Sequence, residues 1–313
     1  MSAGDRTPLL VIVGPTGSGK SALAEDVARR TSGEIISADA FAVYRGFDVG
    51  TAKPTARRRA EIPYHLVDVA DPNETFSAGR WAALARRAAE EIRARGRLPI
   101  VAGGSGFYVS ALLDGLPSGE ARDQARRGRL TEWAQARPDA ARRFLRVNDP
   151  ASAVRIGTGN LRSVIRALEI LLVTGRPASE RAAPGTSWRD GWRVVLVGIA
   201  PDRTTLHARI ARRVCEMLDA GWDEEVRGLL DSGLSLQTNA FCAIGYREVA
   251  DWVRGGADQS KTESKITAAT RQLAKRQRTW FSRERGIRWL DPDRALPAIL
   301  ALLNETGETE RDG

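Results

Sequence analysis

The sequence predicts an α/β fold in which a parallel sheet carries helices on both faces and an all-helical domain is inserted into this core. Short apolar runs alternate with amphipathic helical segments over residues 9–104, which is the pattern of parallel strands joined by helical crossovers. The next part of the chain contains helical segments without a convincing strand, and an apolar run then returns at 192–200.

The first part of the core is expected to hold four strands and two helices. One helix follows the first strand as SALAEDVARR (21–30), and the other, rich in Ala and Arg, covers 78–95 and ends before Gly96. The expected strands are the apolar runs LLVIV (9–13), GEIISADA (33–40), YHLVDVADP (64–72) and LPIVAGG (98–104).

Three Arg-rich helical segments between about 119 and 175 are expected to form the inserted domain. A loop with Pro and Gly separates them from the strand WRVVLVGIA, and the rest of the chain is expected to be helical. The predicted divisions are a core at 1–118, a helical insertion at 119–183, a mostly helical second part of the core at 184–304, and a polar, disordered tail at 305–313.

Composition excludes several classes of protein. With 313 residues and 42% hydrophobic content the chain can bury a sizeable core, and no apolar run approaches the roughly 20 residues of a membrane span. The opening MSAGDRTP lacks the pattern of a signal peptide, so a cytoplasmic protein is expected. Cys215 and Cys242 are isolated, so we expect buried thiols and neither a disulfide nor a zinc site.

The chain is strongly basic, with a net charge of +9 and a pI near 10.2. Such a charge favours a polyanionic partner, because neutralised phosphates release counterions. Almost all of the positive charge is Arg, whose planar fork suits phosphate. The alternative is compositional, since genomes rich in G and C encode Arg and Ala readily and this chain is rich in both. Charge alone therefore leaves a nucleic-acid partner open.

The segment Gly14-Pro15-Thr16-Gly17-Ser18-Gly19-Lys20-Ser21 matches G-x-x-x-x-G-K-[ST] completely, between an expected strand and an expected helix. Its glycines let backbone N–H groups converge on a phosphate at a helix N-terminus. Lys20 supplies a cation, and the Ser21 hydroxyl can ligand Mg²⁺. The motif makes the predicted core P-loop NTPase-like and predicts a diphosphate site, but it does not show that the diphosphate belongs to ATP.

An enzyme that consumes ATP normally also needs an Asp at the end of a hydrophobic strand to hold Mg²⁺. Asp68 in HLVDV is a candidate, whereas LPIVAGG ends in glycines. A kinase therefore stays open at this point.

Longer blocks of the sequence resemble those of the bacterial tRNA dimethylallyltransferase family, the IPP transferases. The most specific is 36–54, in which a strand ends at an Asp and runs on through VYRG and GTAKP. The resemblance covers nearly the whole chain, in order, without the C-terminal zinc-finger extension of eukaryotic members. The other blocks are IPYHLVDVADPNETFSA, LPIVAGGSGFYVSALLDGL, VIRALEI, LHARIARRVCEML, AIGYREV and TRQLAKRQRTWF.

This resemblance implies transfer of a dimethylallyl group from dimethylallyl diphosphate to N6 of adenosine 37, beside the tRNA anticodon, with release of diphosphate (i6A formation). It also implies a P-loop core with a helical insertion and a channel that tRNA and donor enter from opposite sides. Mg²⁺ is the expected cofactor. The expected partners are the tRNA anticodon stem-loop and dimethylallyl diphosphate. No association with a membrane is expected, and the protein is expected to be a monomer.

The resemblance also assigns three catalytic roles. Asp39 matches a general base that accepts a proton from the adenine amine, although a strand-end Asp can instead cap the following turn. Ser21 matches the hydroxyl that ligands Mg²⁺, and Arg213 matches the Arg that reaches the diphosphate. Arg209 shares the helix face of Arg213, whereas Arg212 is expected to be solvated. The Arg residues of LHARIARRVCEML could instead be surface charges.

A further set of positions matches residues that contact tRNA. Within it, the hydroxyl residue after the double glycine could instead cap the next helix, and the Tyr could be a core-edge aromatic. The set comprises Asp39, Ala40, Phe41, Ala42, Ser105, Arg126, Arg162, Arg166, Tyr246 and Arg247.

The sequence departs from the family pattern at three places. Ala40-Phe41-Ala42 stands where the family has Ser-Met-Gln, so the amide that contacts adenine is missing. The segment GGSGFY stands where the family more commonly has GGTxxY, and Gly106 is expected to loosen the turn there. In the run 159–163 before VIRALE, Arg162 is displaced by one position, which leaves its phosphate contact open.

Two other functions stay open. A P-loop kinase of a small metabolite would turn over ATP without tRNA, and a non-catalytic RNA-binding relative would bind tRNA without transfer. The presence of Lys20, Ser21, Asp39 and Arg213 argues against an inactive relative.

Overall fold

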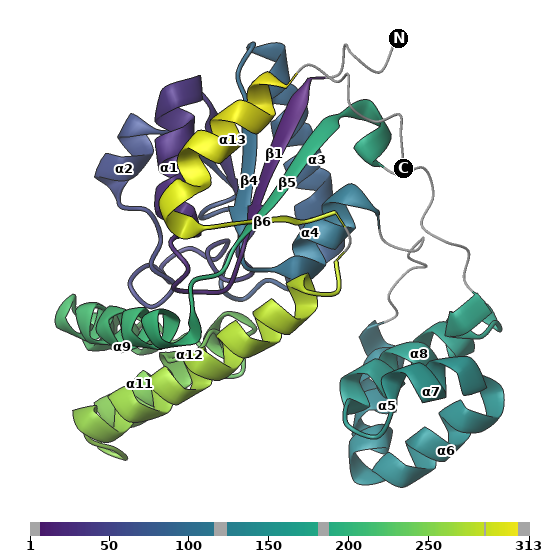
Figure 1. Cartoon of the computed structure of the whole chain (residues 1–313). Coiled ribbons are helices and arrows are strands. Elements are labelled where there is room, and N and C mark those ends of the chain that lie inside the picture. Colours follow the sequence, from purple (N-terminus) through teal and green to yellow (C-terminus); the bar gives the residue numbers. More distant parts are fainter. Residues whose placement is uncertain (1–6, 116–123, 181–187, 285, 306–313) are drawn as a thin grey trace. The chain divides into compact units, whose positions relative to one another are not determined.

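The computed structural model describes residues 7–115, 124–180, 188–284 and 286–305 (Figure 1). The chain divides into two compact units, one formed by Met1–Leu113 with Trp188–Gly313 and the other by Asp114–Ser187. The expected boundaries at 118/119 and 183/184 lie outside the described residues, as do residues 306–313 of the expected tail.

A parallel sheet forms the centre of the first unit, with the strand order β3-β2-β4-β1-β5-β6 within the described residues. The inner strands are almost continuously apolar and buried, because helices cover both faces of the sheet. This confirms the predicted α/β class. The strands are β1 (Pro8–Val13), β2 (Glu34–Ser37), β3 (Tyr64–His65), β4 (Pro99–Gly103), β5 (Arg193–Ile199) and β6 (Arg288–Leu290).

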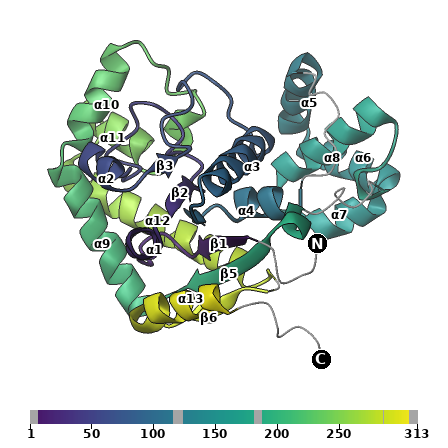
Figure 2. The same ribbon diagram turned by 90° about the horizontal axis from the view of Figure 1, so that it is seen from above.

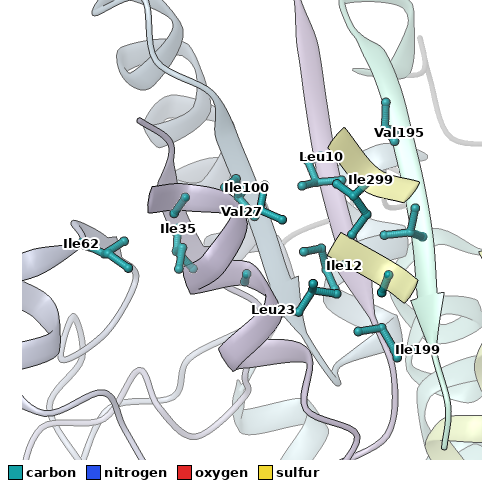
Figure 3. Close-up of a cluster of buried hydrophobic side chains, with 14 residues drawn as sticks. Leu10, Ile12, Leu23, Val27, Ile35, Ile62, Ile100, Val195, Ile199 and Ile299 are labelled. Atoms are coloured by element: carbon teal, nitrogen blue, oxygen red, sulfur yellow. The ribbon is translucent and has the colours of Figure 1, made fainter. Parts of the chain in front are cut away.

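Helices α1 (Lys20–Thr31) and α13 (Ala295–Asn304) cover one face of this sheet (Figure 2). Leu10 and Ile12 of β1 belong to the buried cluster on this face, together with Val27 of α1 and Ile299 of α13 (Figure 3). The alternation of side chains along each strand explains why these residues share a face.

The opposite face is covered by α3 (Ala78–Ala94) and α4 (Gly106–Leu113) (Figure 2). Trp81 of α3 stacks on Tyr108 of α4, with ring centroids 4.7 Å apart. The Trp81 Nε1 donates a hydrogen bond to the carbonyl oxygen of Ser37 at 2.9 Å, which attaches α3 to the end of β2.

The carboxyl ends of the strands are crossed by α9 (Arg203–Asp219) and α12 (Gln259–Phe281) (Figure 1). These two helices pack together through Leu206, Ile210 and Ala274. They therefore bring side chains to the edge of the sheet at which ligands of open α/β sheets bind. The remaining helices of this unit are α2 (Ala56–Glu61), α10 (Trp222–Asp231) and α11 (Tyr246–Val253).

The described residues of the second unit form helices and the turns between them, without a strand. Its small core contains Ala134, Leu145, Val164 and Leu168. Its helices are α5 (Gln124–Ala136), α6 (Pro138–Asn148), α7 (Pro150–Ile156) and α8 (Leu161–Thr174), of which α7 lies outside the three segments expected from the sequence.

The structure corrects three local expectations. The segment expected as a strand at 64–72 has only two strand residues, because Leu66 and Asp68 take left-handed φ values of 62° and 59°. The C-terminal part is not wholly helical, since β6 pairs with β5. Both thiols are free as expected, but neither is fully buried: Cys215 is half-buried and Cys242 is exposed.

Among the described residues, no helix combines the length and the apolarity that crossing a membrane requires.

Candidate active site

The phosphate loop joins the end of β1 to the start of α1. Gly19, the residue before α1, has a φ of 93°, a left-handed conformation that glycine adopts without strain. A Cβ on Gly14 would lie 2.3 Å from the carbonyl oxygen of Ile199, so only glycine fits against the end of β5. The loop therefore turns directly from β1 into the N-terminus of α1, the kind of helix end at which free N–H groups can bind a phosphate.

Two long side chains from distant helices hold the loop in place. The backbone N–H of Thr16 donates to Oε1 of Gln277 in α12 at 2.8 Å, and Gln277 Nε2 donates to the carbonyl oxygen of Gly104 at 3.0 Å. Arg209 of α9 donates to the carbonyl oxygen of Ser18 at 3.3 Å. Sequence analysis did not find the role of Gln277, because the partners lie 261 and 173 residues away.

The loop opens onto a cavity of about 820 Å³, a volume that includes its open mouth. Four residues proposed from the sequence for the chemistry line this one cavity: Lys20 and Ser21 from α1, Asp39 after β2, and Arg213 from α9. The structure thus brings together the predicted cation, hydroxyl, carboxylate and guanidinium. The wall is completed by the loop 51–54 and by residues of β4 and α12.

Lys20 and Arg213 make the cavity a site for an anion. Burial is the main reason why the pKa of Lys20 falls to about 8; Arg213 lowers it further, and Asp39 raises it. Burial also lowers the pKa of Arg213, an effect that Asp39 opposes. Two desolvated cations facing one carboxylate leave a positive charge, so a diphosphate entering the cavity gains more than it would from exposed cations.

Asp39 caps a turn and also lines the cavity. Its Oδ1 accepts hydrogen bonds from the backbone N–H groups of Phe41 at 2.8 Å and Ala42 at 3.2 Å, so it caps the following turn. The same side chain lines the cavity. Within the described residues no hydrogen bond to Oδ2 is formed, so one carboxylate oxygen remains for a proton.

The loop after β2 is fixed by two sets of polar contacts. The ammonium of Lys53, only 2% exposed, bonds to carboxylates of Asp48 at 2.7 Å and Asp68 at 2.6 Å. The Glu225 carboxylate accepts from the N–H groups of Asp48 and Val49, both at 2.8 Å. These contacts give the GTAKP segment a structural role in holding one wall of the cavity.

Asp68, the candidate ligand of a kinase metal, lies elsewhere. Its carboxylate also pairs with Arg59 at 2.6 Å, and it is not among the residues that line the cavity. The hydrogen bonds from Lys53 and Arg59 keep its pKa low, against the effect of burial. This carboxylate is engaged by structural cations, which disfavours the kinase.

Some of the predicted tRNA-contacting residues lie near the cavity. Ala42 lines it, and Ala40 and Phe41 are half-buried beside it. Ser105 follows the cavity-lining Gly104 and donates its backbone N–H to the carbonyl oxygen of Ala38 at 3.2 Å.

Tyr246 requires a correction. Its side chain is 0% exposed, packs against Phe47 and Trp222, and donates its hydroxyl to Glu225 at 2.6 Å. It is a core residue and offers no surface to tRNA. Its neighbour Arg247 is exposed and donates to the carbonyl oxygen of Leu236.

The remaining predicted contacts lie in the helical unit. Arg162 is exposed in the first turn of α8, and Arg166 pairs with the buried Glu169 at 2.8 Å. Arg126 lies in α5. The guanidinium of Arg166 is thus already paired with a carboxylate of its own helix.

Gly106 does not loosen its turn, contrary to expectation. A Cβ at this position would lie 2.1 Å from Cδ1 of Trp280, so the glycine allows the α4 backbone to pack against that indole. This is a tight helix contact.

The fold and site together define a P-loop enzyme that acts on a phosphorylated substrate, because a phosphate loop, two half-buried cations and a carboxylate share one cavity. Comparison with known proteins gives the family. The model of the IPP transferase family matches residues 42–284, and that of isopentenyl transferases matches residues 7–62. The chain belongs to the IPP transferase family.

Similar curated proteins include the tRNA dimethylallyltransferase of Solibacter usitatus, 44% identical over 90% of this chain and 92% of that protein. That of an Anaeromyxobacter species is 47% identical over 91% of this chain and 94% of the relative.

Solved structures agree. The tRNA isopentenylpyrophosphate transferase of Bacillus halodurans is 35% identical with a TM-score of 0.69, covering 96% of both chains. A eukaryotic dimethylallyltransferase acting on tRNA is 25% identical with a TM-score of 0.79, covering 95% of this chain and 78% of that one.

Proposed function

We propose that this chain transfers the dimethylallyl group of dimethylallyl diphosphate to N6 of adenosine 37, next to the anticodon of tRNA, and releases diphosphate. The observation that carries the proposal is the meeting of Lys20, Ser21, Asp39 and Arg213 on one cavity. The names of the relatives, which act on tRNA, support the same reaction.

The phosphate loop, Lys20 and Arg213 bind the diphosphate of the donor. As the bond between C1 of the allyl group and the bridging oxygen breaks, negative charge grows on the leaving diphosphate. Two cations that are already desolvated stabilise this charge without reorganising. Arg213 and Lys20 thus make the departure of diphosphate easier.

Mg²⁺ fits the chemistry of this site. Among the described residues, no three His, Cys, Asp or Glu side chains form a metal centre of their own. The Ser21 hydroxyl at the phosphate loop suits Mg²⁺, which is usually held by few protein oxygens together with substrate phosphates. When bound, the ion would neutralise charge on the diphosphate.

Asp39 takes the proton in this mechanism. The exocyclic amine of adenine is a weak nucleophile, because its lone pair is delocalised into the ring. As N6 forms its bond to C1, the amine loses one proton, and Oδ2 of Asp39 accepts it while Oδ1 stays bound to the turn. The bond to the diphosphate breaks with both electrons on oxygen.

The acceptor is the anticodon stem-loop of tRNA, which supplies the polyanion that a net charge of +9 favours. We propose that exposed Arg residues, Arg162 and Arg247 among them, contact its backbone. We also propose that the protein acts as a monomer in the cytoplasm, where tRNA is modified.

The test is incubation with undermodified tRNA, Mg²⁺ and labelled dimethylallyl diphosphate, followed by nucleoside analysis. Label in N6-dimethylallyladenosine at position 37 is the expected result. Binding of tRNA without any labelled nucleoside would favour the non-catalytic relative instead.

A further inference from the structure

Two large aromatic side chains are exposed side by side on the first unit, and we call this pair the aromatic step. Phe107 in the first turn of α4 is 53% exposed, and Trp280 near the end of α12 is 47% exposed. Their rings meet edge to face, with centroids 6.5 Å apart and planes at 81°. Aromatic surface left in water at two adjacent positions points to a binding surface.

This step is held rigidly by its surroundings. The backbone of Gly106 packs so closely on Trp280 that a Cβ there would lie 2.1 Å from the indole. One edge of Trp280 is thus fixed while almost half of its surface stays accessible. A rigid aromatic surface binds a flat ligand at low cost in conformational entropy.

The step lies three residues along the chain from two residues that line the active-site cavity. Gly104 and Gln277 line the cavity and are hydrogen-bonded to each other at 3.0 Å. Phe107 comes three residues after Gly104, and Trp280 comes three residues, about one helical turn, after Gln277. A molecule whose reacting group enters the cavity would therefore have its adjacent part near this step.

The charge around the step favours a nucleic acid over an apolar protein partner. Arg276 and Arg283 are both exposed. Arg276 stands four residues before Trp280 on the same side of α12, and Arg283 follows in the turn after the end of this helix. Aromatic faces interleaved with Arg are what proteins use to stack bases and hold the adjoining phosphates.

We propose that Phe107 and Trp280 stack a base of the anticodon loop that neighbours the target adenosine. This inference rests on the proposed function. When the adenosine leaves the loop and enters the cavity, the neighbouring base loses its stacking partner. The aromatic step replaces that partner and so stabilises the opened loop.

The experiment measures the affinity of anticodon stem-loop RNA without donor, so that no catalysis is needed. Three RNAs are compared: the natural loop, and loops that are abasic on the 5′ or the 3′ side of the target adenosine. Each is titrated with wild-type protein, Phe107→Ala, Trp280→Leu, Trp280→Phe and Trp289→Ala. Trp289, 42% exposed on β6, is the matched control, because it has similar exposure and lies outside the α4–α12 pair that forms the step.

Removal of a base that stacks on an aromatic residue is expected to weaken binding by about 5- to 150-fold. With wild-type protein, one of the two abasic RNAs should bind more weakly than the natural loop by this factor. With Trp280→Leu, the same abasic RNA should bind almost as tightly as the natural loop does. Trp280→Phe should retain most of the affinity, and Trp289→Ala should behave as wild type. Donor affinity of Trp280→Leu should stay unchanged, which shows that the variant is folded.

The proposal is overturned if both abasic RNAs bind the wild type as tightly as the natural loop does. It is also overturned if the loss of binding free energy caused by Trp280→Leu and the loss caused by the abasic site are additive when the two changes are combined. Coupling between Trp280 and one flanking base, in a protein that transfers no prenyl group, would support the stacking surface and refute the proposed function.

Discussion

At the scale of single residues, Lys20 gives the site a dependence on pH. Burial holds its pKa at about 8, so it is charged below that pH and becomes neutral above it. Donor binding needs the charged form. We therefore predict that kcat/KM for dimethylallyl diphosphate declines above about pH 8, whereas kcat declines less, because bound diphosphate raises the pKa again.

The matched variant is Lys20→Arg, whose guanidinium does not titrate in this range. Its kcat/KM should be lower but flat across pH 8. A decline of equal steepness in this variant would assign the titration to another group.

Asp39 can be tested more sharply than by truncation to Ala, because Oδ1 also caps the turn at Phe41 and Ala42. Asp39→Asn keeps an oxygen for these two N–H groups but cannot accept a proton. We predict that single-turnover transfer by this variant falls about 10²- to 10⁴-fold, with donor and tRNA affinities close to wild type. Near-normal turnover together with lost tRNA binding would make Asp39 a recognition residue.

The sequence predicted which residues meet at the cavity better than it predicted the packing around single residues. Lys20, Ser21, Asp39 and Arg213 belong to contiguous motifs with a known geometry, and all four line the cavity. Tyr246 could not be placed, because burial depends on what other segments pack around it. The contact of Gln277 with Thr16 spans 261 residues, and no local pattern encodes such a pair.

At the scale of elements, two glycines enclose the indole of Trp222. A Cβ would lie 2.2 Å from this ring on Gly50 and 2.0 Å on Gly245, which also has a φ of 97°. The GTAKP and AIGYRE blocks thus meet around the start of α10. The matched control is Gly255, which has a φ of 82° and has no atom within 4 Å of a Cβ.

We predict that Gly255→Ala lowers the free energy of unfolding by about 1–2 kcal/mol, the cost of a left-handed conformation. Gly245→Ala should cost about 1–3 kcal/mol more, because it also overpacks the core. Urea denaturation followed by tryptophan fluorescence measures both. Equal losses in the two variants would show that α11 moves away from Trp222 at little cost.

Elements with a strong local pattern were predicted well, whereas others depended on distant contacts. The short apolar runs of β1, β4 and β5 were predicted as buried strands, and α3 ends at Ala94, just before the left-handed Gly96 that the sequence indicated. The expected strand at 64–72 stops after His65, where the φ of Leu66 becomes positive and Asp68 is drawn to Lys53 and Arg59. Apolar alternation alone does not reveal this ion-pair cluster.

At the scale of the whole molecule, the net charge of +9 predicts that tRNA affinity falls steeply with salt. Arg162→Ala should reduce the slope of log Kd against log salt by on the order of 0.7–0.9, the loss of one phosphate contact. Arg166→Ala should change the slope less, because Arg166 already pairs with Glu169. Donor KM should not change in either variant, and an unchanged slope in Arg162→Ala would remove that residue from the interface.

The central claim is that this phosphate loop binds a prenyl diphosphate and not ATP as its reacting substrate. The most direct test measures all products of one reaction that contains tRNA, Mg²⁺, dimethylallyl diphosphate and ATP. We predict diphosphate and N6-dimethylallyladenosine in equal amounts, with no ADP formed and with unchanged yield when ATP is omitted. Formation of ADP in proportion to turnover, or dependence of the reaction on ATP, would contradict the claim.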